Sequence, residues 1–302
     1  MSTPLFVWIT EAREPLSRLL ARHGLLHALP AGRVFVDRVR VETSLELEPR
    51  ARVEVFAPRP SARIEVLYEA RELVAVDKPA ALPTEPDKSG NDCVLLQLAD
   101  RIGRPPRDLF AVSRLDVGVS GVLLVATSEQ SRQAILQERA RGTLRRRYLA
   151  LACGVPAPLE GEWRDGLAKG RRGQRVVDAQ QGQAAHTRYR VVATSAPVAR
   201  ERPETSLLAL SPITGRTHQL RVHSSSHAAP LLGDRRYGGP VRMTAADGRV
   251  HSFSQVLLHA ASVEWGAGAD RRRVVSEPSS ALVDAWRGLG GDPTALQRAL
   301  DD

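Results

Sequence analysis

Cysteine is scarce in this chain, and long apolar runs are missing from it. Only Cys93 and Cys153 occur; these two could pair or stay free, but they cannot form the disulfide framework of a small secreted protein. No apolar run approaches the roughly 20 residues that a membrane-spanning helix needs. The opening residues have neither the basic segment nor the long apolar segment of a signal peptide. We therefore expect a cytoplasmic protein that makes no use of a membrane.

Lysine is far rarer than arginine, and the chain as a whole is basic. There are 43 basic and 34 acidic residues, which gives a net charge of +9. The planar fork of arginine suits phosphate groups, so a polyanion is the natural partner, although genome composition could also favour arginine over lysine. The arginines form separate short runs, as expected of a basic surface that follows a phosphate backbone: Arg145–Arg147, Arg171–Arg172, Arg235–Arg236 and Arg271–Arg273.

Length and composition favour an ordered protein with one large domain. Hydrophobic residues make up 42% of the 302 positions, enough for a packed core in a large domain that carries at most a small appendage. Several segments have the pattern of a regular element. We expect a helix at Glu129–Arg141, capped by Gly142, hairpins within 161–194, and strands at the following places: Arg63–Tyr68, Leu73–Val76, Leu144–Gly154 and Ser206–Leu210.

The most informative stretch runs from Val112 to Thr127. Its five apolar residues Val122–Ala126 predict a fully buried strand. Before this strand, Gly118 and Gly121 predict a turn with backbone angles closed to other residues, and Asp116 lies in that turn. Loops held by a rigid scaffold often carry chemistry. From this stretch alone, however, the pattern favours an Asp116 that only caps the turn, with Arg114 as a solvated neighbour.

A second informative stretch lies at Pro212–His223, which contains Thr-Gly-Arg-Thr-His-Gln-Leu-Arg. Thr214–Thr217 could form an anion-binding turn at the start of a helix. Three histidines, His218, His223 and His227, follow one another closely and could suggest a metal site. No cysteine or carboxylate lies at ligand spacing around them, so we do not expect a metal.

These stretches resemble the motifs of the pseudouridine synthases of the RluA type. Val112–Thr127 resembles motif I, H-R-L-D-x-x-T-S-G-L-L-L-x-A-K, with Ser113 for His and Val119 for Thr. Thr214–Val222 resembles motif III, L-x-T-G-R-T-H-Q-I-R-V-H, and differs at these nine positions only by Leu220. Further motifs of the family follow the same order: Asp77–Thr84, with Ala81 for Gly, Leu144–Gly154, Pro230–Gly238 and Leu257–Ala260.

The resemblance implies a mixed α/β (α+β) fold, in which residues 61–302 form a large, mostly antiparallel sheet with flanking helices and a central cleft. Residues 1–60 resemble a shortened S4 RNA-binding domain, with a helix at Pro15–His23 and a hairpin at Gly32–Val41. This small unit could bind RNA or could simply be a packing appendage. Pro58–Pro60 has the composition of the linker that ends it.

The implied activity is isomerisation of uridines in ribosomal or transfer RNA to pseudouridine. By resemblance Asp116 is the catalytic carboxylate, Arg221 keeps it ionised and oriented, and Tyr148 stacks on the target base and assists proton removal from C5. The resemblance implies further contacts to the substrate from these residues: Arg114, Arg216, Thr217, His218, Leu232 and Lys78. The reaction involves no redox step and no group transfer, so we expect no cofactor and no metal, and we expect a monomer.

Two other functions remain open at this point. Ser113, Val119 and Ala81 depart from the family motifs, so the chain could be a catalytically silent RNA-binding or chaperone-like protein on the same fold. It could also be an unrelated acid–base hydrolase that uses Asp116 and His218, although no motif for binding such a substrate is present. Retention of Asp116, Tyr148 and Arg221 favours the synthase. The RNA and the target uridine are not determined.

Overall fold

The computed structural model describes residues 4, 6–29, 33–41, 43–56, 62–70, 72–86, 92–195, 204–245 and 247–301, without the side chains of His27 and Arg172. The predicted Pro58–Pro60 linker and Gly32, the first residue of the predicted hairpin, lie outside the described residues. Within the described part, no helix is long and apolar enough to cross a membrane.

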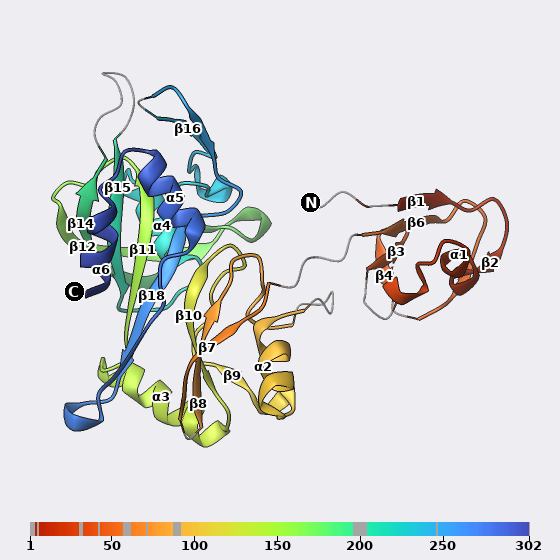
Figure 1. Ribbon diagram of the computed structural model, residues 1–302, viewed down its shortest axis with the longest axis horizontal. Coiled ribbons are helices and arrows are strands. Elements are labelled where there is room, and N and C mark those ends of the chain that lie inside the picture. Colours follow the sequence, from red (N-terminus) through yellow and green to blue (C-terminus); the bar gives the residue numbers. More distant parts are fainter. Residues whose placement is uncertain are drawn as a thin grey trace.

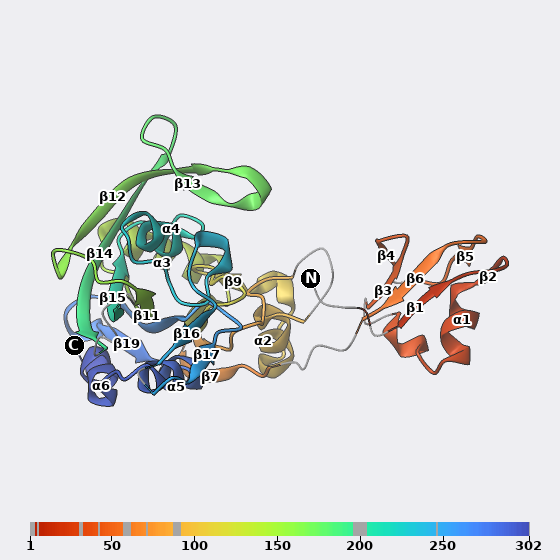
Figure 2. The same cartoon turned by 90° about the horizontal axis from the view of Figure 1, so that it is seen from above.

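The small unit is a four-stranded sheet packed on a short helix (Figures 1 and 2). The order of its strands is β1 (Phe6–Ile9), β6 (Arg52–Val55), β3 (Val34–Val36) and β4 (Val39–Val41), with α1 (Leu16–Arg22) against them and β2 (Glu14–Pro15) paired to β5 (Glu46–Leu47). Asp37 and Arg38 make the β3–β4 turn with positive φ angles of 48° and 67°, as a two-residue hairpin requires. The unit has a core of its own, centred on Leu16, Leu20 and Val53.

The large body is built on one 11-stranded sheet (Figure 1). Its main path has the order β13-β12-β14-β15-β11-β18-β10-β8-β7, and β9 and β19 pair at the sides. The bounds are β7 (Glu65–Ala70), β8 (Leu73–Lys78), β9 (Phe110–Ala111), β10 (Ser120–Ala126), β11 (Arg145–Cys153), β12 (Glu160–Lys169), β13 (Arg175–Val177), β14 (Gln183–Thr194), β15 (Thr205–Pro212), β18 (Leu258–Trp265) and β19 (Arg272–Val275). Among the described strands of this sheet, the pairs are antiparallel except β10 with β18, so the predicted fold class is confirmed.

Strand β10 is buried along its whole length, as its run of apolar residues predicts. It pairs with β8 on one side and, over Ser120 and Gly121 only, with β18 on the other. Gly121 has φ 109°, and a Cβ there would lie 2.3 Å from the carbonyl oxygen of Ala260. Gly118 has no positive φ, so the prediction of a special backbone angle is correct for Gly121 and wrong for Gly118.

Helices cover both faces of the sheet. The bounds are α2 (Val94–Ile102), α3 (Glu129–Arg141), α4 (Gln219–Ser226), α5 (Ser280–Gly288) and α6 (Pro293–Asp301). Helix α3 has the predicted limits, because Ser128 caps its start and Gly142, at φ 75°, ends it. Side chains of β11 alternate between the two cores: Tyr148 and Ala150 join the core that contains α2, and Leu149 and Leu151 join the core of α5 and α6.

The hairpins predicted within 161–194 are β12, β13 and β14, and they arch over α4 in Figure 2. The arch is tied to the body by hydrogen bonds near its tip. The amide N–H of Arg175 donates to the hydroxyl of Tyr237 at 2.9 Å, and Nε2 of Gln174 donates to the carbonyl of Arg236 at 3.2 Å. A smaller hairpin, β16 (Arg242–Thr244) with β17 (Val250–Ser252), lies farther along the chain.

Candidate active site

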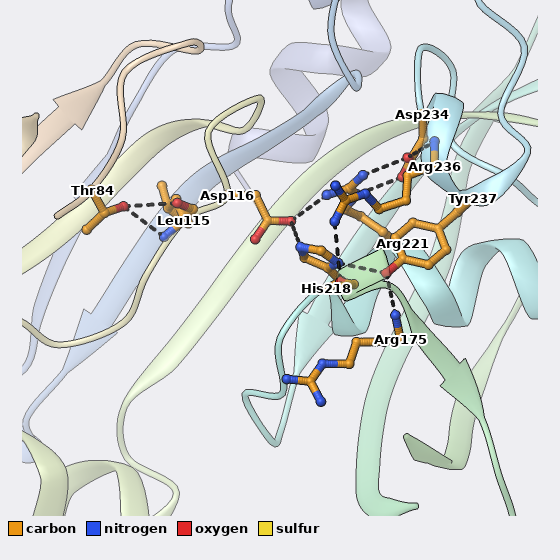
Figure 3. Close-up of polar contacts among 10 residues, drawn as sticks. Thr84, Leu115, Asp116, Arg175, His218, Arg221, Asp234, Arg236 and Tyr237 are labelled. Atoms are coloured by element: carbon orange, nitrogen blue, oxygen red, sulfur yellow. Dashed lines mark hydrogen bonds and ion pairs between the residues drawn. The ribbon is translucent and has the colours of Figure 1, made fainter. Parts of the chain in front are cut away.

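The loop that carries Asp116 is clamped on its N-terminal side by Thr84. The Thr84 hydroxyl donates to the carbonyl of Leu115 at 2.9 Å and accepts from the amide of Leu115 at 3.2 Å. After Asp116, its carbonyl accepts from the amide of Val119 at 3.0 Å and closes a turn. Figure 3 shows Thr84, Leu115 and Asp116 in line. The backbone around Asp116 is therefore fixed by local hydrogen bonds.

One oxygen of Asp116 is held by Arg221, which projects from the first turn of α4 (Figure 3). Nη1 of Arg221 donates to Oδ2 of Asp116 at 2.8 Å, and its Nε and Nη2 donate to the two oxygens of Asp234, each at 2.7 Å. Asp234 is only 1% exposed. A bidentate guanidinium–carboxylate pair has a fixed geometry, so buried Asp234 sets the direction in which Arg221 points at Asp116.

The charge on Arg221 is secured by the same contacts. Burial by itself would lower the pKa of Arg221, but the hydrogen bonds and charges of Asp234 and Asp116 outweigh burial and raise it. The guanidinium also lies over the ring of Tyr237, 5.0 Å from its centre, which adds a cation–π contact. Arg221 thus remains a cation between two carboxylates.

The second oxygen of Asp116 is open. Among the described residues no hydrogen bond or ion pair reaches Oδ1, whereas Oδ2 has both the Arg221 contact and the imidazole of His218, with Nε2 at 3.7 Å. The Asp116 side chain is 26% exposed. One half of the carboxylate is thus held by the protein, and the other half is available to a substrate.

His218 connects this carboxylate to the arch over α4. It precedes α4 with a positive φ of 58°, and its Nδ1 lies 2.7 Å from the hydroxyl of Tyr237, which accepts the amide N–H of Arg175 (Figure 3). Burial lowers the pKa of His218, although the charge of Asp116 opposes this effect. A neutral imidazole is therefore expected near pH 7.

Tyr148 lies on β11 at a register shift in its pairing with β18. It is buried, and no described residue forms a hydrogen bond with its hydroxyl. Burial raises its pKa; the charge of Arg146 lowers it, and the charge of Asp116 raises it further. Tyr148 lines a small pocket with Ser113, Arg146 and Ser262. A buried tyrosine whose hydroxyl is not bonded to any of the described residues has a donor available for a ligand.

Two of the predicted substrate contacts do not fit the structure. Lys78 is 0% exposed, and its ammonium group donates to the carbonyls of Leu82 at 2.7 Å and Pro79 at 2.9 Å. Burial lowers the pKa of Lys78 to about 8, and Asp116 and Asp77 oppose this effect. Leu232 is also fully buried and belongs to the core of α5 and α6, whereas its neighbour Leu231 belongs to the core that contains Tyr148.

The other predicted contacts lie at the surface of the same region. Arg114, Arg216 and Thr217 are exposed. Arg114 has a loose ion pair with Glu85 at 3.8 Å, and Nε of Arg216 donates to the carbonyl of Ala184 at 3.1 Å. Three further residues of this site, Thr84, Asp234 and Tyr237, were not predicted from the sequence, although all three lie inside segments that resemble the family motifs. Their place inside these motifs was the signal that could have pointed to them, since none of the three has a distinctive local sequence pattern.

No group of three or more His, Cys, Asp or Glu side chains is placed to hold a metal ion in the described part of the chain. His223 and His227 instead lie near Asp165, at 3.7 Å and 2.8 Å from its Oδ2. His227 also stacks on Trp163.

A sequence model described as RNA pseudouridylate synthase matches residues 72–226. The chain is 30% identical over 232 residues to "Dual-specificity RNA pseudouridine synthase RluA" of Escherichia coli (strain K12), covering 72% of this chain and 99% of that protein. It is also 30% identical over 246 residues to "Ribosomal large subunit pseudouridine synthase D" of Xanthomonas campestris pv. campestris, covering 76% and 68%. Among solved structures, "Human RNA Pseudouridylate Synthase Domain Containing 4" aligns with a TM-score of 0.58 at 23% identity, covering 74% of this chain and 92% of that one. This last likeness concerns the fold.

Proposed function

Because this chain belongs to the RNA pseudouridylate synthase family, we propose that it isomerises uridines of ribosomal or transfer RNA, with Asp116 as the catalytic carboxylate. It is an RNA pseudouridine synthase of the RluA type and hence an isomerase. The catalytic assignment rests on the unequal environment of the two carboxylate oxygens of Asp116. Arg221 holds Oδ2 at 2.8 Å, while Oδ1 has no partner among the described residues.

This arrangement suits the reaction. Pseudouridine formation breaks the N1–C1′ bond of uridine, turns the base, joins C5 to C1′ and releases the proton of C5. A carboxylate with one fixed and one open oxygen can attack C1′, take a proton from the sugar or add to the ring, and all three paths remain open here. In each of them Arg221 supplies a prearranged positive charge beside the reacting carboxylate, so little reorganisation is needed during the reaction.

Tyr148 and the exposed residues complete the proposed site. The buried ring of Tyr148 offers a face for the target base, and its free hydroxyl is available near C5. The target must leave its helix to reach Asp116, at a cost of a few kcal/mol. Arg114, exposed two residues before Asp116, is suited to fill the vacated space or to bind a phosphate. Arg216, Thr217 and His218 lie on the neighbouring turn.

Lys78 takes a different role in this proposal. It acts as a positioning residue, because its ammonium group joins the carbonyls of Leu82 and Val117, the latter at 3.4 Å. The amide of Ala81 donates to the same Val117 carbonyl at 2.7 Å. Lys78 therefore links the 79–82 loop to the loop that carries Asp116. Leu232 is left with a packing role.

The test is Asp116→Asn, with Asp108→Asn as a control that changes the net charge equally at an exposed site. The assay is tritium release from 5-³H-uridine in RNA from a strain that lacks the gene. We expect Asp116→Asn to fold and bind RNA as well as wild type, or better because a negative charge facing a polyanion is removed, but to release no tritium. Asp108→Asn should retain full activity. If folded Asp116→Asn releases substantial tritium, Asp116 only caps its turn, since asparagine caps nearly as well. If wild type itself releases none, the silent RNA-binding alternative is favoured.

We also propose that residues 1–60 and 61–302 are separate domains, because the small unit has its own core. Residues 61–302 expressed alone should then unfold in one cooperative transition by circular dichroism. A molten state without near-ultraviolet signal would contradict this boundary.

We further propose that the enzyme works as a monomer in the cytoplasm, where ribosomal and transfer RNA are present. Sedimentation at micromolar concentration and fractionation of cells test these two statements. A stable dimer, or recovery in the membrane fraction, would contradict them.

A further inference from the structure

The side chains of Arg139 and Arg146 meet at Gly215, and a third arginine, Arg216, follows this glycine directly in the chain. They come from different elements: Arg139 from the last turn of α3, Arg146 from β11, and Arg216 from the turn before α4. Their closeness is seen at Gly215. A Cβ at this glycine would lie 2.1 Å from Nη2 of Arg139 and 3.3 Å from Nη1 of Arg146.

No carboxylate neutralises this arginine cluster within the described residues. Nη2 of Arg146 donates to the carbonyls of Pro212 at 3.2 Å and Thr214 at 3.0 Å, and Nε of Arg146 is buried without any partner there. Among the residues that the structure describes, Arg216 donates only to the carbonyl of Ala184. The Arg139 side chain has neither a hydrogen bond nor an ion pair with a described residue.

The like charges act on one another. Burial lowers the pKa of Arg139, and the charges of Arg146 and Arg216 lower it further. The C-terminal end of α3 favours cations, and this explains why some arginine is tolerated there. The helix end alone does not explain why Arg139 lies beside the other arginines. Arg141 belongs to the same last turn of α3, and its side chain is exposed to solvent. An anion bound among the three would remove the repulsion and satisfy the buried Nε.

The position of the cluster indicates which anion it takes. Arg146 lies two residues before Tyr148 on the same strand and lines the same pocket, and strand residues two apart share a face. Arg139 and Arg146 both act on the Tyr148 hydroxyl through their charge. Guanidinium groups bind phosphate oxygens with paired hydrogen bonds. A phosphate at this place would belong to the strand that presents the target base.

We propose that Arg139, Arg146 and Arg216 form a binding site for a backbone phosphate of the RNA, next to the nucleotide whose base reaches Tyr148. This inference rests on the proposed function, because it takes RNA as the substrate. It assigns a ligand to a part of α3 that none of the sequence motifs includes.

The experiment compares Arg139→Gln with Arg141→Gln. The two variants lose the same charge from the last turn of the same helix, and neither residue contacts Asp116, Tyr148 or Arg221. With 5-³H-uridine RNA, Arg139→Gln should raise the apparent KM about tenfold, the effect of one charge-assisted hydrogen bond, and change kcat less than twofold. The slope of log(kcat/KM) against log[salt] should become shallower by about 0.7, the value for one phosphate contact of a single strand. Arg141→Gln should change KM less than twofold.

A second measurement does not need activity. Inorganic phosphate at 100 mM should raise the Tm of wild type and of Arg141→Gln by about 2 °C over sodium chloride of equal ionic strength. Arg139→Gln should show no such difference. Arg139→Glu should also lose the phosphate effect while its Tm in chloride is equal to or above that of wild type, because the new carboxylate neutralises the cluster. A merely structural Arg139 would instead give a lower Tm in Arg139→Glu.

The outcomes separate this inference from the proposed function. If wild type forms pseudouridine and Arg139→Gln matches Arg141→Gln in KM, salt slope and phosphate effect, the phosphate site is wrong and the enzyme assignment stands. If wild type forms none, the proposed function fails, and the phosphate-dependent Tm alone decides whether the cluster binds an anion. An equal phosphate effect in all variants would mean that the ion acts elsewhere, and would overturn the site.

Discussion

The triad Asp116–Arg221–Asp234 and the cluster Arg139–Arg146–Arg216 place charge near the same tyrosine in opposite ways. In the triad one guanidinium lies between two carboxylates, with three hydrogen bonds of 2.7–2.8 Å. In the cluster three guanidinium groups converge with no carboxylate among the described residues. In the triad each charged group has a partner of opposite charge before substrate arrives, whereas the arginines of the cluster would gain such a partner only when an anion binds.

With the roles proposed above, the difference follows from what each region has to do. A group that reacts needs a geometry that is already set, so that no reorganisation is required in the transition state. Buried Asp234 provides this by fixing Arg221. A group that recognises a polyanion needs charge that the protein itself leaves unpaired, at some cost to its own stability. Catalysis and recognition thus make opposite demands on arginines that lie close together.

The largest effect that tests this comparison is on stability. Arg221→Leu would leave buried Asp234 and partly buried Asp116 without their partner, and breaking such a buried pair typically costs about 3–5 kcal/mol. Arg139→Leu removes a cation that repels Arg146 and Arg216 and that the C-terminal end of α3 favours only modestly, in a helix where leucine and arginine are equally favourable. We expect Arg139→Leu to change the free energy of unfolding by less than about 0.5 kcal/mol. Urea unfolding of both variants at pH 7 measures this, and equal losses would show that the two regions do not differ.

The next effect is on turnover. Tyr148→Phe keeps the aromatic ring and removes a hydroxyl that makes no hydrogen bond to a described residue, so stability should change little. If the hydroxyl assists proton removal from C5, kcat should fall by about 10²-fold, within the usual range for acid–base groups. The apparent KM for RNA should stay within about twofold, because stacking remains. Wild-type turnover in Tyr148→Phe would reduce Tyr148 to a packing residue.

The smallest effect concerns pH and the buried Lys78. Its folded pKa, about 8, lies below the value of about 10.4 in an unfolded chain. Between these values the unfolded state binds more protons, so stability attributable to Lys78 rises with pH. Relative to Lys78→Met, wild type should therefore gain about 1 kcal/mol of unfolding free energy from pH 7 to pH 9. Paired denaturant titrations at the two pH values check this. A difference that is independent of pH would mean that Lys78 titrates normally.

The sequence predicted those parts that depend on continuous patterns. The apolar run at Val122–Ala126 became β10, and the helix at Glu129–Arg141 has its predicted end at Gly142. Arg221 was predicted as the partner of Asp116 because each lies in its own family motif, and their Oδ2–Nη1 hydrogen bond fits that prediction.

What the sequence could not give is the direction of side chains and the meeting of distant elements. Leu232 was expected at the substrate, yet it is fully buried in the core of α5 and α6. Neighbouring residues of an extended segment face opposite ways, and the sequence does not show which face Leu232 takes. Lys78 was expected at the substrate, yet its side chain turns inward to carbonyl groups. Arg139 could not be found at all, because only folding brings the end of α3 against Gly215.

The short pairing of β10 with β18 has a wider consequence. Asp116 lies in the loop before β10, in the half of the sheet that contains β7, β8 and β10, whereas Tyr148 and Arg221 belong to the half of the body built from β11–β18 and α4. These halves of the sheet meet along a seam two residues long, Ser120 with His259 and Gly121 with Ala260, with the Ser120 hydroxyl 2.9 Å from Nδ1 of His259. The proposed catalytic residues therefore lie on two halves of one sheet, and the strand pairing between these halves contains none of them. Side chains of both halves also pack together in two cores. At Gly121 the backbone of β10 lies directly against Ala260 of β18, so a single added carbon has no room unless the two halves of the sheet move apart.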